Sequence, residues 1–77
     1  MKRRSDDIEV REVRGWPVEI RRDGRVYRVC EMLDVWVVQG HWWGDEEKRV
    51  FFRVRTDRGA IELYRSGPRW VLSKELD

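Results

Sequence analysis

The chain has 77 residues and a formal net charge of +2 at pH 7, so it forms one domain near the lower size limit for a self-sufficient core. Its single cysteine, Cys30, excludes an internal disulfide and any multi-cysteine zinc site. The longest apolar runs, such as residues 35–38, fall far short of a membrane span, and residues 1–7 lack a signal-peptide stretch, so we expect a cytoplasmic protein that engages no membrane.

Alternating segments fill the first half of the chain. Residues 1–7 are charged and polar, and we expect a flexible arm there, followed by a single small β domain over residues 8–77. Residues 8–13 and 17–21 alternate apolar and charged side chains, which is the period of a half-buried strand. Asp23-Gly24 then predicts a tight hairpin turn into a third strand over residues 25–33, because this dipeptide tolerates the positive φ angles that such turns need.

The second half of the chain begins with a tryptophan-rich strand over residues 35–43, in which Gly40 predicts a bulge or a sharp bend. Residues 44–48 are typical of an acidic, exposed connection. Three further strands are predicted at residues 49–56, 60–65 and 69–74. Six or seven short strands without a helical stripe predict an all-β fold, a small antiparallel meander curled into a barrel or a strongly bent sheet.

Five tryptophans are more than a core of this size needs, because each is large and brings an N–H donor that needs a partner. We expect a single core built from Trp36, Trp42, Phe52, Leu63 and Trp70 and supported by Val18, Ile20, Val29 and Val54. Trp16 and Trp43 adjoin Pro17 and Gly44 and are the candidates for exposure. Both are predicted protein-interaction residues, since Trp is enriched at interface hot spots.

The titratable residues argue against catalysis. His41 is the only histidine, and with Cys30 alone it does not complete a tetrahedral zinc site. A Cys30–His41 nucleophile–base pair remains an alternative that no local motif supports. The adjacent acids at residues 45–47 are more typical of a solvated loop than of a cation site. We therefore expect no enzyme, no cofactor, no metal and no small-molecule substrate.

Arginine supplies a second binding hypothesis, because 14 of the 17 basic residues are Arg, the type best suited to phosphate. Residues 1–28 contain nine basic and six acidic residues, against eight and nine in the remainder. The candidate nucleic-acid surface joins a hairpin tip to an outer strand face and comprises Arg21, Arg22, Arg25, Arg28, Phe51, Arg53 and Arg55. Small barrels hold single strands by stacking bases on such aromatics. The plainer interpretation is a soluble outer face whose Arg stems cover apolar surface.

The order of the aromatic residues adds a resemblance to a known family. The pattern runs Trp36-x3-Gly40-x-Trp42-Trp43, Arg49-x2-Phe52-x-Val54, Leu63-Tyr64-Arg65, Trp70-x-Leu72 and terminal Leu76-Asp77. Over residues 17–77 it resembles the small C-terminal region of ImuB-type proteins, the catalytically degenerate Y-family polymerase relatives of the bacterial mutasome, and its free-standing short relatives. The chain departs from that pattern at residues 50–52, where a more acidic strand is usual, and at Leu76, where Tyr is usual.

The resemblance implies a setting in bacterial DNA damage tolerance and translesion synthesis, and it implies no activity. It also implies partners such as a RecA-like accessory protein, an error-prone replicative polymerase or a sliding clamp. We therefore expect a non-catalytic protein-interaction adaptor. The alternative is a small-barrel binder of single-stranded nucleic acid that uses the basic hairpin and exposed aromatics.

Overall fold

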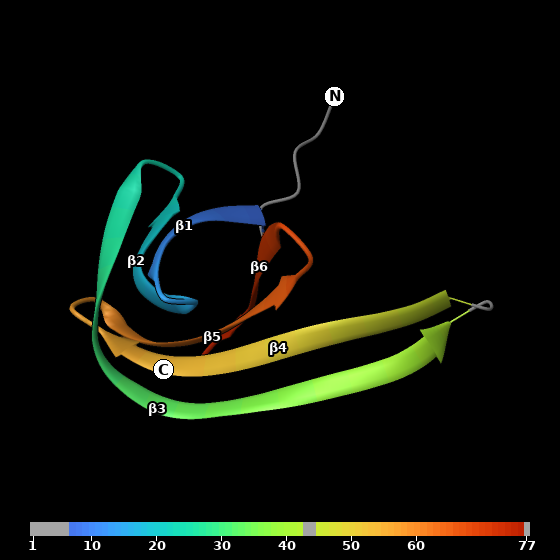
Figure 1. Ribbon diagram of the computed structural model, residues 1–77. Coiled ribbons are helices and arrows are strands. Elements are labelled where there is room, and N and C mark those ends of the chain that lie inside the picture. Colours follow the sequence, from blue (N-terminus) through green and yellow to red (C-terminus); the bar gives the residue numbers. More distant parts are fainter. Residues whose placement is uncertain (1–6, 43–44, 77) are drawn as a thin grey trace.

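The computed structural model describes residues 7–42 and 45–76, with side chains described for residues 8–40 and 48–76. Within them the strands are β1 (Asp7–Val13), β2 (Trp16–Arg22), β3 (Arg25–Trp42), β4 (Asp45–Thr56), β5 (Gly59–Ser66) and β6 (Arg69–Glu75). Each strand pairs antiparallel with the next, and β6 pairs with β1 (Figure 1). The predicted all-β meander is confirmed as a small closed barrel. The arm predicted at residues 1–7 lies outside the described residues except for Asp7, which begins β1.

Tight turns join the first three strands. Asp23 and Gly24 have φ angles of 52° and 76°, so the predicted Asp-Gly hairpin is present between β2 and β3. Arg14 and Gly15, at 54° and 85°, form an equivalent turn between β1 and β2. These turns place the β1–β2 and β2–β3 connections at opposite ends of the barrel.

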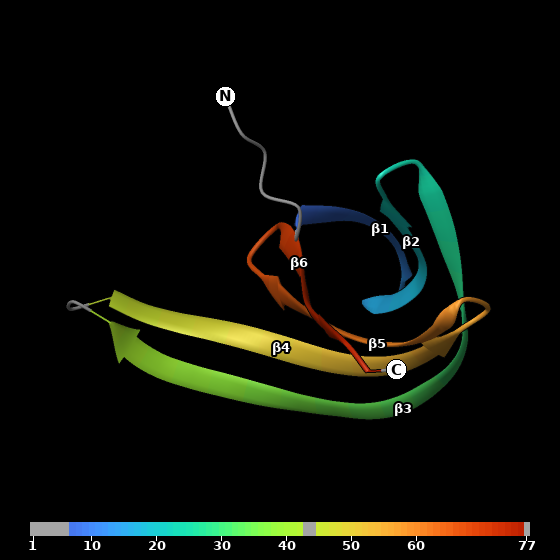
Figure 2. The ribbon, with the colours of Figure 1, turned by 180° about the vertical axis from the view of Figure 1, so that it is seen from behind.

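The β3–β4 hairpin is longer than the sequence pattern indicates. The two strands predicted at residues 25–33 and 35–43 are one strand of 18 residues, and β4 begins at Asp45. The connection predicted at residues 44–48 is therefore wrong over 45–48. Figures 1 and 2 show this hairpin extending well past the rest of the barrel.

The bend in β3 does not lie at Gly40, which pairs with Glu47 in unbroken register, so the predicted bulge there is wrong. The register instead shifts between Val29 and Glu31 and between Met32 and Asp34. Cys30 and Leu33 are thus the extra residues. Such bulges bend a strand and increase its twist, which lets β3 serve both the barrel wall and the projecting hairpin.

One hydrophobic core fills the barrel. Its buried residues are Ile20, Phe52, Val54, Ile61, Leu63, Trp70 and Leu72. Five of the nine predicted core residues are among them: Ile20, Phe52, Val54, Leu63 and Trp70. Val29 packs against this cluster, whereas Val18 is only half-buried, and the side chain of Trp42 lies outside the described residues.

Trp36 is not a core residue, and its predicted place there is wrong. It pairs with Phe51, while the neighbouring pair, Val35 and Phe52, presents Phe52 to the core. Because successive side chains in a strand point to opposite faces, Trp36 and Phe51 lie on the outer face. Their rings stack there at 5.3 Å with an interplanar angle of 8°.

Candidate binding surfaces

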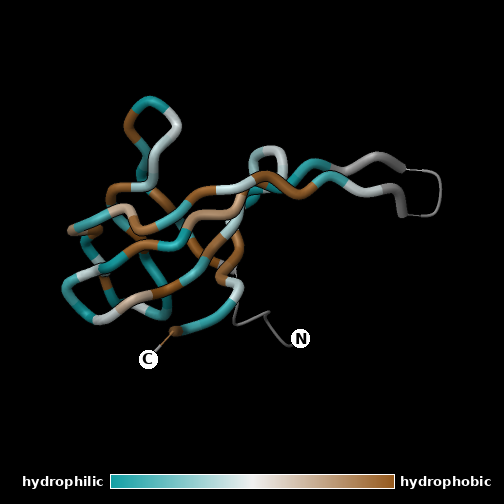
Figure 3. The backbone as a smooth tube through the Cα atoms, turned by 90° about the horizontal axis from the view of Figure 1, so that it is seen from below, coloured by the Kyte–Doolittle hydropathy of each residue, from teal (hydrophilic) through white to brown (hydrophobic). Residues whose placement is uncertain are grey.

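One edge of β3 carries no strand partner over most of its length in the described part of the chain. β2 pairs with β3 only at residues 25–28, and β4 pairs along the opposite edge from Val29 to Trp42. The bulges at Cys30 and Leu33 lie where β3 leaves β2. From that point the edge that faced β2 is open, and it runs out along the projecting hairpin (Figure 3).

The part of the open edge beyond the bulges, residues 35–39, lacks charged side chains and Pro. Exposed edge strands in natural proteins are commonly blunted by charged side chains, by Pro or by short length. Residues 35–39 contain none of these, and Val35, Val37 and Val38 are 41%, 54% and 38% exposed. Main-chain donors and acceptors beside exposed apolar side chains make this edge a template for a further strand.

Trp16 contacts the β4 residue that pairs with Val35 of this edge. Its side chain is 46% exposed, and its ring stands edge-on to Phe52 at 6.0 Å between centroids. Phe52 is in turn the cross-strand partner of Val35. The adjoining Pro17 is buried and has no N–H to offer a strand partner. Trp16 therefore presents aromatic surface next to the open edge, whereas Trp43, the other predicted interaction residue, lies outside the described residues.

The outer-face residues of the nucleic-acid hypothesis are engaged within the protein. Phe51 is stacked on Trp36 and tilted against Tyr64 at 5.0 Å. Arg53 Nη2 donates to Glu62 Oε1 at 3.0 Å, and its guanidinium lies 5.3 Å from the Trp36 ring centroid. Arg55 Nε donates to Glu31 Oε1 at 3.1 Å. These contacts favour the plainer interpretation, in which Arg side chains cover an aromatic outer face.

Strand alternation divides the four arginines of the basic hairpin between two faces. Arg22 pairs with Arg25, two residues along the strands from the pair of Ile20 and Tyr27. Because Ile20 is a core residue and side chains alternate along a strand, Arg22 and Arg25 belong to the inward-facing series. Arg21 and Arg28 belong to the opposite, outward-facing series. The sequence cluster is therefore two pairs of arginines in different surroundings.

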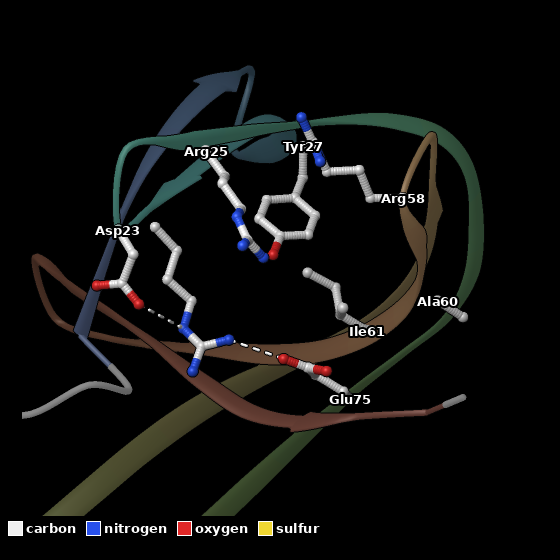
Figure 4. Close-up of a pocket in the computed structure, with 8 residues that line it drawn as sticks. Asp23, Arg25, Tyr27, Arg58, Ala60, Ile61 and Glu75 are labelled. Carbon is white, nitrogen blue, oxygen red and sulfur yellow. Dashed lines mark hydrogen bonds and ion pairs between the residues drawn. The ribbon is translucent and has the colours of Figure 1, made fainter.

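Arg22 and Arg25 line a cavity of about 460 Å³ at the end of the barrel, together with Tyr27 of β3 and Arg58 of the β4–β5 turn (Figure 4). Arg58 and Tyr27 were not predicted from the sequence as candidate site residues. Arg58 is separated from Arg25 by the whole projecting hairpin, and no local motif marks either residue. A second hollow, on the other side of the β2–β3 turn, is lined by Arg21, Arg22 and Val26.

No protein-family model, curated protein sequence or solved structure matches the chain. The resemblance to the ImuB-type region thus rests on the residue pattern alone. Among the described residues there is no group of three or more His, Cys, Asp and Glu side chains placed to hold a metal ion. No helix of the described chain is long and apolar enough to cross a membrane. Cys30 is exposed, with Sγ 3.7 Å from the carbonyl oxygen of Arg28, and the side chain of His41 is not described.

Proposed function

We propose that this protein is a non-catalytic adaptor that binds an extended segment of a protein partner along the open edge of β3. The observation that carries the proposal is the uncharged, exposed edge of residues 35–39 on a hairpin that projects from the barrel. Strand addition gives affinity through main-chain hydrogen bonds and selectivity through alternate side chains. Val35 and Val37 lie on one face of β3, where they would contact apolar side chains of the added strand.

Trp16 serves as the aromatic anchor of this surface. A half-exposed Trp held edge-on by Phe52 is already ordered, so a partner loses little conformational entropy in contacting it. Trp side chains in such positions often dominate binding energy. The partner strand would thus run along β3, with one end beneath Trp16.

The resemblance to the ImuB-type region supports the biological setting of this proposal, bacterial DNA damage tolerance. It names three kinds of partner to examine: a RecA-like accessory protein, an error-prone replicative polymerase and a sliding clamp. An adaptor without catalytic groups suits a pathway in which a polymerase is recruited to a lesion by protein contacts.

The edge is tested by charge at Val37, the most exposed valine of the hairpin. Val37→Lys should weaken binding to the cognate partner at least about tenfold, because lysine on an edge strand opposes strand addition. Val37→Thr keeps the β-branched shape and should bind nearly as the natural protein does. Each nuclease-treated candidate partner is titrated against the natural protein, Val37→Lys and Val37→Thr by fluorescence anisotropy. Absence of saturable binding to all three candidates contradicts the proposed setting, and equal binding by the lysine variant contradicts the edge.

Trp16 is tested separately by Trp16→Ala, with Trp43→Ala as its companion from the sequence prediction. Truncation of an interface anchor should cost at least about tenfold in partner affinity while leaving the far-UV circular dichroism of the barrel unchanged. The melting midpoint is the control for folding. If Trp16→Ala unfolds the domain, Trp16 acts as a lid on the core, and its role as an anchor is wrong.

A further inference from the structure

The end of the barrel opposite Trp16 contains a second recognition feature, independent of the β3 edge. Three segments that are distant in sequence meet there: the β2–β3 turn, the β4–β5 turn and the last residues of β6. The cavity between them has a volume of about 460 Å³, within the range of small-ligand sites. The side chains that give it chemical character are Arg22, Arg25, Tyr27, Arg58, Ile61 and Glu75.

Two of the three guanidinium groups at this cavity have no carboxylate partner in the described part of the chain. Arg22 Nη1 is paired with Glu75 Oε2 at 2.8 Å, and its Nε lies 4.0 Å from Asp23 Oδ2. Arg25, by contrast, forms no ion pair with any described residue. Arg58 uses its Nε to donate to the Val26 carbonyl at 3.1 Å, which leaves both Nη groups without a carboxylate.

One aromatic side chain, Tyr27, lines the otherwise mostly polar cavity. Tyr27 is half-buried and packs against the core, and Ile61 is 5% exposed. The Arg58 guanidinium lies 5.7 Å from the Tyr27 ring centroid, which holds both groups in a fixed relation. In Figure 4, Arg25 and Tyr27 extend into the cavity from β3, while the guanidinium of Arg58 lies against β3 at the backbone end of the Tyr27 side chain.

We propose that this cavity binds the phosphate group of a nucleotide, with Arg25 and Arg58 on the phosphate and Tyr27 against the base. Arg is the side chain best matched to phosphate, because its planar donors make paired charge-assisted hydrogen bonds. The Arg22–Glu75 ion pair positions the rim and takes no part in binding the phosphate.

The same phosphate chemistry is offered by a free nucleotide and by a nucleotide within a single strand. The experiment therefore titrates the full-length protein with three probes: inorganic phosphate, adenosine 5′-monophosphate and a short oligothymidylate. Binding is followed by two-dimensional ¹H–¹⁵N NMR at about 50 mM ionic strength, where screening of exposed charges is weak. We expect saturable shifts of the Arg25, Tyr27 and Arg58 amides with at least one nucleotide probe. Saturation by the monophosphate identifies a free nucleotide, and saturation by the oligonucleotide alone identifies a strand.

The decisive variant is Arg25→Gln, and Arg28→Gln is its matched control. Both remove one positive charge from β3, but Arg28 is exposed in the outward-facing series and does not line the cavity. Loss of a charge-assisted hydrogen bond should weaken nucleotide binding at least about tenfold for Arg25→Gln and less than about twofold for Arg28→Gln. Arg58→Lys keeps the charge without the fork and should lie between them.

Two results overturn the proposal. The absence of saturable shifts with any probe at about 5 mM would mean that the cavity does not bind phosphate with a millimolar or lower dissociation constant. Equal losses for the Arg25 and Arg28 variants would mean diffuse attraction of anions to a basic surface. Val37→Lys should leave nucleotide binding unchanged, so failure here and failure of the proposed adaptor function are separate outcomes.

Discussion

Glu62 is a buried carboxylate that depends on two particular donors. It is 6% exposed, and it accepts hydrogen bonds from Arg53 Nη2 at 3.0 Å and from Ser73 Oγ at 3.1 Å. A buried charge is tolerated only when it is paired and hydrogen-bonded. Arg53 is therefore a structural residue on the outer face, and the aromatic contact of its guanidinium with Trp36 adds to that role.

Arg53→Met should destabilise the barrel, because it leaves the Glu62 carboxylate with Ser73 alone while keeping an apolar stem over Trp36. We expect a loss of about 1–3 kcal/mol in the free energy of unfolding. Arg55→Met is the matched control, since Arg55 and Glu31 are 59% and 58% exposed and such pairs contribute about 0–1 kcal/mol. Urea denaturation of both variants measures the difference. Equal midpoints would show that Glu62 does not need Arg53.

At the scale of the element, the β1–β2 turn carries a strained residue. Arg14 has a φ of 54°, in the left-handed region that costs an ordinary side chain roughly 1–2 kcal/mol. Arg14→Asn would create Asn-Gly, the dipeptide favoured in such turns, and should raise the melting midpoint by several degrees. Arg21→Asn removes the same charge from a regular strand position and should lower the midpoint, because Asn is disfavoured in strands. A midpoint unchanged or lowered by Arg14→Asn contradicts the strain argument.

Local chemistry explains which elements could be predicted from the sequence. Asp23-Gly24 has the composition of its turn, and the alternation of Phe52, Val54 and Thr56 in β4 follows one buried face, so both were found. The bulges at Cys30 and Leu33 have no compositional signature, and Gly40, the residue that suggested a bend, sits in regular pairing. The long hairpin and its open edge were missed for that reason. The cavity was missed because Arg25 and Arg58, far apart in sequence, line it together only once β3 pairs with β4 as far as Val29 and Thr56.

At the scale of the whole molecule, the barrel closes through the seam between β1 and β6. Among the described residues, these strands pair at Asp7 with Val71 and at Ile8 with Trp70. Side chains reinforce this seam: Trp70 Nε1 donates to Glu12 Oε2 at 3.2 Å, and Arg65 Nη1 lies 3.6 Å from Glu12 Oε1. The seam thus depends on one tryptophan that belongs both to the core and to the contact between the first strand and the last.

Trp70→Ala should therefore remove much of the stability of the domain. Trp70 is 8% exposed and lies 5.5 Å from Phe52, so its truncation leaves a large cavity that should cost about 3–5 kcal/mol. A domain of this length has a total free energy of unfolding of roughly 4–12 kcal/mol. Trp70→Phe keeps a smaller aromatic ring in the core and loses the bond to Glu12 together with part of the indole packing, so it should cost about 1–2 kcal/mol, less than the alanine variant. Urea unfolding followed by far-UV circular dichroism measures both. If Trp70→Ala unfolds at the same urea concentration as Trp70→Phe, the ring does not support the core, and the seam is held by its backbone pairs alone.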